Sequence, residues 1–434
     1  MRRLDKEILR LALPALGALA ADPLVSMVDT VFVGRLGVLP LAALGVNTSI
    51  FALSFVVFNF LAYGTTPLVS RAAGRGDLRA AGGYAVQALL LAILVGMLAT
   101  VTLEILAVPI VTLMGAGPEL GPSAVSYLRI RALAGPAVLL ITAGHGAFRG
   151  YGDTRTPLVV TLGLNIVNVV LDPLFIFGFG WGLEGAALAT LIAQWIGALW
   201  FLELLLRRRR IALGIEARWP RLVELIPFLR IGGELALRTV ALIGTMTLAT
   251  AIATRVGTVQ VAAHHVGIQV WLLLAMAVDA LAVAAQVLVA RHRGSGEAGV
   301  ARRVANRLLM WGLVSGITLA VLFAALSPIL PRLFTDEVSV LREIRGIYPF
   351  IVAMQPLNAL VFVWDGVLLG AEDFRFVAVQ MMVSSACAAI VLLLVLPAGW
   401  GLVGVWWGIV TLMVVRLITV AARYRSPRLL STGT

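Results

Sequence analysis

The stretch LNIVNVVLDPLFIFGFGWGLEGAALATLIAQ at residues 164–194 contains two apolar runs that are separated by a glycine-rich turn. Followed outward, these runs extend over residues 155–178 and 183–206, and each is longer than the roughly 20 residues that a helix needs to cross a bilayer. The turn sequence GWGLEG at 180–185 returns near the end of the chain as GWGLVG at 399–404. The stretch therefore predicts a membrane-spanning helical hairpin that occurs in two related copies.

The composition of the whole chain agrees with a protein that lies mostly in a membrane. Of its 434 residues, 60% are hydrophobic and 13% are charged, whereas a soluble domain carries about 25% charged residues. The single cysteine, Cys387, excludes an intrachain disulfide and a cysteine-based metal site. We predict an all-α integral membrane protein with twelve spans, near residues 8–33, 41–70, 82–114, 122–147, 155–178, 183–206, 232–254, 261–290, 302–330, 345–369, 374–397 and 401–424.

The positive charges orient these spans. Lys and Arg are enriched in cytoplasmic loops, and here every second connection is basic. The charges are Arg2, Arg3 and Lys6; Arg71, Arg75 and Arg79; Arg149 and Arg155; Arg207 to Arg210, Arg218 and Arg221; Arg291, Arg293, Arg302 and Arg303; and Arg423, Arg425 and Arg428. The alternation predicts a multi-pass protein of the cell inner membrane with both termini in the cytoplasm. It also explains the net charge of +12 without a nucleic-acid partner.

A shift of 220 residues superimposes the two halves of the chain. Pro136, Gly146, Gly150 and Asp153 then meet Pro356, Gly366, Gly370 and Asp373. Because each half has an even number of predicted spans, both halves cross the membrane in the same direction, as in transporters with parallel repeats. We predict an N-lobe at 1–206, a cytoplasmic linker at 207–230 and a C-lobe at 231–434, with alternating access at a central cleft.

Three carboxylates break this symmetry and belong to the N-terminal half alone. Asp22, Asp29 and Asp172 meet only apolar residues under the shift: Leu242, Ala249, and Val391 or Leu392. An acid within a bilayer costs about 2.5–3.5 kcal/mol on insertion scales, so a functional role is the default interpretation. Asp22 also precedes Pro23, which predicts a kink in the first helix.

Polar neighbours reinforce this interpretation. Asn165 and Asn168 share one helical face with Asp172, and Thr190 in the next span lies at a similar depth. A carboxyl group away from water can exchange protons near neutral pH, and with amide and hydroxyl neighbours it can also hold sodium. The predicted cation or proton site is therefore Asp22, Asp29, Asn165, Asn168, Asp172 and Thr190. Polar pairing that merely satisfies helix packing is the alternative.

The C-terminal half has weaker candidates. Asp279, Gln355, Asn358 and Asp365 are polar residues within predicted spans and could line a substrate cleft, whereas Glu234 and Arg238 have the spacing of an ion pair. Trp271, Trp364, Trp400, Trp406 and Trp407 could line the same cleft or belong to core and interfacial belts. The four histidines lack the spacing of metal ligands, so we predict no metal site. The sequence also lacks a recognisable pairing of a nucleophile with a base, so we predict neither an enzyme nor an organic cofactor.

The chain resembles the multidrug and toxic compound extrusion (MATE) transporters, in the branch typified by the DNA-damage-inducible protein F. The resemblance covers nearly the whole chain and is carried by residues 11–37, 147–158, 164–194 and 279–290. It implies a V-shaped twelve-helix exporter that exchanges H⁺ or Na⁺ for hydrophobic, often cationic compounds. It assigns Asp29 to the first-helix aspartate of the family, Asn168 and Asp172 to a fifth-helix pair, and Thr190 to a sixth-helix hydroxyl. Thr142 stands where some relatives carry asparagine.

We therefore predict a proton-driven antiporter that exports amphipathic organic compounds, with the lipid bilayer and a small-molecule substrate as its only evident partners. A sodium-coupled exporter and a lipid-precursor flippase of the same superfamily remain alternatives. A flippase should line its cleft with several cations, and few intramembrane arginines besides Arg238 stand out in the sequence. A passive channel would conduct without coupling to an ion gradient.

Overall fold

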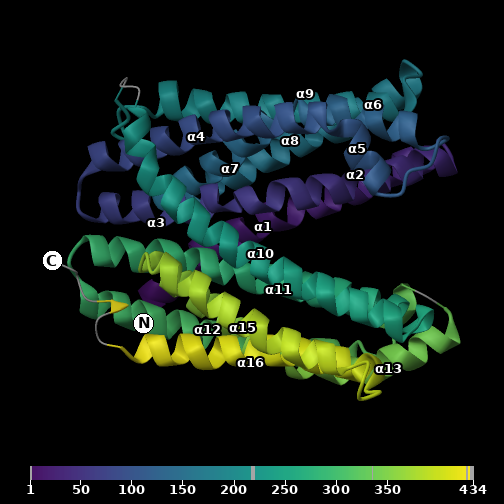
Figure 1. Ribbon diagram of the computed structural model, residues 1–434. Coiled ribbons are helices and arrows are strands. Elements are labelled where there is room, and N and C mark those ends of the chain that lie inside the picture. Colours follow the sequence, from purple (N-terminus) through teal and green to yellow (C-terminus); the bar gives the residue numbers. More distant parts are fainter. Residues whose placement is uncertain (1, 217–219, 335, 427–428, 431–434) are drawn as a thin grey trace. The chain divides into compact units, whose positions relative to one another are not determined.

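The computed structural model describes residues 2–216, 220–334, 336–426 and 429–430. Every regular element in these ranges is helical (Figure 1). Arg218 and Arg428, two of the predicted basic loop residues, lie outside the described residues. The chain separates into two compact units.

The first unit comprises Leu13–Gly232 and is called the N-unit. Its helices are the part of α1 (Arg2–Gly34) from Leu13 onward, α2 (Val38–Val56), η1 (Val57–Asn59), α3 (Phe60–Gly74), α4 (Leu78–Ile105), α5 (Ala107–Leu113), α6 (Gly121–Ala132), α7 (Gly135–Gly150), α8 (Arg155–Pro173), η2 (Leu174–Gly178), α9 (Gly182–Glu203), η3 (Leu204–Arg208), η4 (Leu222–Leu225) and the start of α10 (Ile226–Val256). The helix α1 runs without interruption through Pro14 and Pro23.

The second unit comprises the described residues of Met1–Ala12 and of Gly233–Thr434 and is called the C-unit. It contains the first turns of α1, the remainder of α10, α11 (Thr258–Gly294), α12 (Ala298–Ala325), η5 (Leu330–Leu333), α13 (Val338–Ala353), α14 (Gln355–Gly370), α15 (Phe374–Leu394) and α16 (Gly401–Arg425). Asp5 ties the beginning of α1 into this unit, because its carboxylate accepts hydrogen bonds from Arg307 at 2.6 and 2.7 Å and from Trp311 at 2.9 Å.

The helices are long and apolar enough for the predicted number of spans. Ten candidate spans occur among the described residues, and the number reaches twelve when each of two bent helix pairs is one span. The pairs are α6 with α7, bent by 47°, and α13 with α14, bent by 49°. Pro136 and Pro356 lie at the start of the second helix of each pair, where a proline ring prevents the preceding helix from continuing. The chain is thus a multi-pass membrane protein.

The internal repeat is visible in the packing of the two units. In the N-unit α7 packs against α3 and α4, and in the C-unit α14 packs in the same way against α11 and α12. A Cβ atom on Gly150 would lie 2.6 Å from Cβ of Val69, and one on Gly370 would lie 3.1 Å from Cβ of Val289. Both contacts join positions that the 220-residue shift equates, so the repeated glycines serve the same close helix approach in each unit.

Candidate ion-coupling site

A cavity of about 220 Å³ opens within the N-unit between α1, α2, α6, α8 and α9. Its lining contains most of the polar residues that the sequence singles out in this half. The lining residues are Asp22, Val25, Ser26, Asp29, Leu44, Thr48, Phe51, Tyr127, Arg131, Asn165, Asn168, Thr190 and Gln194. The structure therefore brings five of the six predicted coupling residues to one cavity, and the sixth, Asp172, lies directly behind them.

The helix α8 supplies the buried polar face of this cavity. Asn165, Asn168 and Asp172 are 7%, 3% and 0% exposed, because their spacing turns all three toward the interior of the unit. Asp172 is followed by Pro173 and by the π-helical segment η2, so the helical ladder is interrupted directly after the carboxylate. Such interruptions are frequent at functional sites.

Hydrogen bonds connect α8 to the neighbouring helices α1 and α9. The Nδ2 of Asn168 lies 3.3 Å from Oδ1 of Asp172 and 3.3 Å from Oγ1 of Thr190, both of which can accept from it. Asn165 donates to Oδ1 of Asp22 at 3.1 Å. The two asparagines thus link α8 to the carboxylate of α1 on one side and to the hydroxyl of α9 on the other.

Asp29 and Asp172 form a pair of acids. Their carboxyl groups are close enough to interact electrostatically with each other. Two carboxylates at this range repel one another unless they share a proton or a bound cation. Oδ1 of Asp29 and Oδ2 of Asp172 are buried and have no hydrogen-bond partner among the described residues, so the pair keeps acceptor capacity for an ion.

Two further ionisable residues of the cavity are absent from the sequence prediction. Tyr127 and Arg131 lie one turn apart on α6, and both line the cavity. The guanidinium of Arg131 lies over the ring of Phe51, with its carbon 4.9 Å from the ring centroid, and its Nη1 is buried without a hydrogen-bond partner among the described residues. Its charge also acts on Asp29. The sequence feature that could have identified Arg131 is its position as a charged residue within the predicted span 122–147.

Thr142, the residue that replaces an asparagine of some relatives, takes no part in this cavity lining. Its hydroxyl donates to the carbonyl of Val138 at 2.9 Å, one turn earlier in α7. The polar lining contributed by the fourth predicted span consists instead of Tyr127 and Arg131.

In the C-unit, Asp365 is the centre of a buried charge cluster. Its Oδ2 accepts from Arg416 at 2.5 Å and from Arg238 at 2.8 Å, and the Arg416 and Asp365 side chains are 1% and 5% exposed. The sequence suggested Glu234 as the partner of Arg238 and did not single out Arg416, which lies in the last predicted span. Because the carboxylate is enclosed by two guanidinium groups, its environment is that of a structural ion pair.

The other predicted cleft residues of the C-unit do not gather around a single point. Asp279 interacts electrostatically with Arg416. The amide of Gln355 donates to the carbonyl of Ile351 at 2.7 Å, and Gln355 and Asn358 are 1% and 3% exposed. Asp279 thus acts on the Arg416 cluster, whereas Gln355 is bonded to the preceding turn of the chain.

The tryptophans divide between core and surface. Trp406 is fully buried in the main apolar cluster of the C-unit, whereas Trp400 and Trp407 are about half exposed. Trp271 contributes to an open apolar groove of about 560 Å³ between α10 and α11, together with Met246 and Thr250. This groove is one surface within the C-unit that suits a hydrophobic compound.

The fold and the cavity define a class of protein: a membrane transporter made of two helical repeats, one of which contains a cavity lined by acids. A family model described as MatE matches the chain twice, at residues 14–174 and 235–395. The chain belongs to this family of multidrug and toxic compound efflux transporters. The two matched segments also confirm the internal repeat.

Several relatives extend over nearly the whole chain. Protein DETOXIFICATION 44, chloroplastic, of Arabidopsis thaliana is 36% identical over 97% of this chain and 82% of its own length. The probable multidrug resistance protein NorM of Thermotoga maritima is 26% identical over 95% and 90%. Among solved structures, the bent form of a Vibrio cholerae MATE transporter has a TM-score of 0.89 at 20% identity and covers 99% of this chain and 97% of its own. An outward-facing multidrug resistance MATE family transporter of the MOP superfamily has a TM-score of 0.86 at 22% identity, with 97% and 95% covered.

Proposed function

We propose that this protein is a proton-coupled antiporter that exports amphipathic organic compounds across the inner membrane. One observation carries the proposal: Asp29 lines a polar cavity of the N-unit, and Asp172, which interacts with it, lies directly behind this lining on Asn168. A pair of this kind can take up a single positive charge and release it again, as coupling to an ion gradient requires.

The coupling follows from competition within one cavity. With the pair ionised, the cavity attracts a cationic or hydrogen-bonding substrate. When a proton enters from outside, it neutralises the pair, weakens the binding of that substrate and favours its release. Because this linkage is reciprocal, substrate binding also expels the proton.

Arg131 adds a fixed positive charge to the same cavity. Because this guanidinium lines the same cavity as Asp29, it favours the ionised state of the pair over permanent protonation. In this proposal Arg131 sets the pH range of transport, whereas the acid pair carries the proton.

The test is efflux of a panel of amphipathic dyes, including ethidium, from proteoliposomes under separately imposed pH and sodium gradients. We expect a pH gradient alone to drive efflux in the wild type, and we expect the Asp29→Asn and Asp172→Asn variants to lose that drive. Asp153→Asn, which changes an acid outside the cavity, is the matched control. Efflux that follows the sodium gradient alone would instead assign the site to Na⁺.

A lipid-precursor flippase is the second candidate, because an arginine lines the N-unit cavity. Arg131 and Arg416 both lie within candidate spans, and Arg131 lines the cavity. Asp365 compensates the charge of Arg416, which leaves Arg131 as the cation available to a phosphate in this cavity. A transbilayer headgroup assay separates the two functions: a flippase moves a pyrophosphate-linked lipid, and an exporter of amphipathic compounds does not.

The orientation and the lobe boundaries belong to the same proposal. The basic connections support a cytoplasmic location of both termini, with an N-lobe at 1–206 and a C-lobe at 231–434 that alternate in access. A cysteine-accessibility scan of the connections would test the orientation directly.

A further inference from the structure

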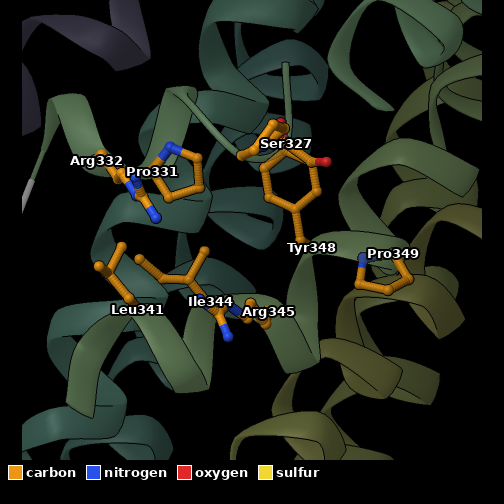
Figure 2. A pocket seen from close by; sticks show the side chains of 9 residues that line it. Ser327, Pro331, Arg332, Leu341, Ile344, Arg345, Tyr348 and Pro349 are labelled. Atoms are coloured by element: carbon orange, nitrogen blue, oxygen red, sulfur yellow. The ribbon is translucent and has the colours of Figure 1, made fainter. Parts of the chain in front are cut away.

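A second polar cavity, of about 430 Å³, lies in the C-unit where α12 is joined to α13. It is lined by Ser327, Pro328, Pro331, Arg332, Leu341, Ile344, Arg345, Tyr348 and Pro349 (Figure 2). The first two prolines and Arg332 come from the connection and from η5, and the residues from Leu341 onward come from α13. The cavity is thus built by two segments that face each other at one end of the unit.

Two arginines give this cavity its charge. Arg332 and Arg345 have no hydrogen-bond or ion-pair partner among the residues that the structure describes, although both line the cavity. Tyr348, by contrast, donates its hydroxyl proton to the carbonyl of Phe323 at 2.8 Å, which fixes its ring as a wall. Two guanidinium groups without a carboxylate partner, held on facing segments, suit an anion with several oxygen atoms.

Membrane topology does not account for these arginines. Along the chain, the connection between α12 and α13 lies between two of the predicted basic, cytoplasmic connections. The positive-inside pattern therefore assigns it to the exterior. Arginine on that side has no orienting role, so another interaction must explain the pair.

The surroundings of the cavity are apolar. Ile329, Leu333, Phe334 and Val338 lie on the same connection or at the start of α13, and they are 48–74% exposed. The connection joins two candidate spans, so these side chains lie near the ends of both spans. An apolar flank next to paired cations is the combination that binds an anionic lipid, with the phosphate at the charges and the acyl chains against the flank.

We propose that the cavity between η5 and α13 binds the phosphate of an anionic phospholipid through Arg332 and Arg345. The ligand class is a phosphodiester headgroup that carries a net negative charge. The exposed apolar flank selects the membrane lipid over free phosphate, and the two guanidinium groups select an anionic headgroup over a zwitterionic one. The site is separate from the acid pair of the N-unit and does not depend on the direction or coupling of transport.

The test measures lipid binding to the full-length protein, delipidated in detergent, by native mass spectrometry. Dioleoyl phosphatidylglycerol is the probe, with dioleoyl phosphatidylcholine and inorganic phosphate as separate arms. We expect the Arg332→Gln/Arg345→Gln variant to bind phosphatidylglycerol about tenfold more weakly than the wild type, because it loses charge-assisted hydrogen bonds. Arg342→Gln is the matched control, since Arg342 lies on the same helix but does not line the cavity, and it should bind as the wild type does.

Three results would overturn the proposal. The first is equal retention of phosphatidylglycerol by the wild type and by the double variant. The second is equal binding of phosphatidylcholine and phosphatidylglycerol by the wild type. The third is displacement of the lipid by inorganic phosphate at an equal concentration, which would make the cavity a site for free anions. Because both arginines are exposed, the unliganded melting temperature of the double variant should match that of the wild type, which separates lost binding from lost folding.

Discussion

Replacing Asp365 by asparagine should destabilise the C-unit strongly. One carboxylate oxygen accepts from both Arg416, at 2.5 Å, and Arg238, at 2.8 Å, within the interior of the unit. The Asp365→Asn variant leaves the buried guanidinium of Arg416 and the partly buried one of Arg238 without this carboxylate. Breaking a buried pair by removing one partner costs about 3–5 kcal/mol, because it leaves an uncompensated charge out of water.

The assay is thermal unfolding of the purified protein, followed by tryptophan fluorescence. A cost of about 3 kcal/mol lowers the melting temperature by roughly 6 °C or more for a unit of about 200 residues. Asp29→Asn is the matched control, because it removes one member of an acid pair and should not destabilise the N-unit. An Asp365→Leu/Arg416→Met variant should recover part of the loss, since it replaces the fully buried ion pair by apolar groups and leaves only Arg238, whose side chain is 15% exposed.

A loss below about 1 kcal/mol in Asp365→Asn, the size of an average substitution, would refute this reasoning. It would mean that water or another group compensates the arginines, and Asp365 would return to consideration as a substrate or ion residue. Loss of dye efflux without loss of stability would point to the same conclusion.

Three further predictions concern other parts of the chain. Arg131→Gln should shift the pH midpoint of dye efflux upward by about one unit, because a positive charge is removed from the cavity; an unchanged pH profile in proteoliposomes would argue against its role. Gly150→Ala should destabilise by about 1–3 kcal/mol, since the new Cβ would lie 2.6 Å from a side chain of α3, whereas Gly83→Ala on an open face of α4 should be neutral or slightly stabilising. Burial alone would raise the pKa of Asp153, but hydrogen bonds from Thr156 and the guanidinium of Arg209 hold this pKa below its usual range. The contribution of Asp153 to stability should therefore be complete above about pH 5 and be lost as the pH falls below about 3.9. In a profile of melting temperature against pH, Asp153→Asn should flatten that acidic part.

The fold was largely predictable because membrane-spanning helices are long, apolar and separated by charged or glycine-rich turns. The glycine-rich turn at 180–185 and its repeat at 399–404 identified the two halves, and the spacing of Asn165, Asn168 and Asp172 identified a buried face of α8. In these cases the signal lies within a single helix, where periodicity alone decides which side chains share a face.

The partners across helices were not predictable in the same way. Arg416 and Asp365 are 51 positions apart, and Arg131 belongs to a different helix from either acid of the pair. Periodicity gives the face of each helix but not its neighbour, so the sequence could not distinguish an acid that awaits a proton from one that two arginines already neutralise. The bends at Pro136 and Pro356 could not be predicted for a similar reason, because a proline limits a helix but does not determine the direction of the next helix.

The most direct test of the central claim is proton release during substrate binding. Ethidium is added to the purified protein in weakly buffered detergent solution, and the pH change is followed with a soluble indicator dye. If the acid pair exchanges the proton, we expect the wild type and Asp153→Asn to release protons when they bind ethidium. We expect Asp29→Asn and Asp172→Asn to bind ethidium without releasing protons. Proton release of equal size in all four proteins would contradict the central claim, because the exchanged proton would then reside outside the Asp29–Asp172 pair.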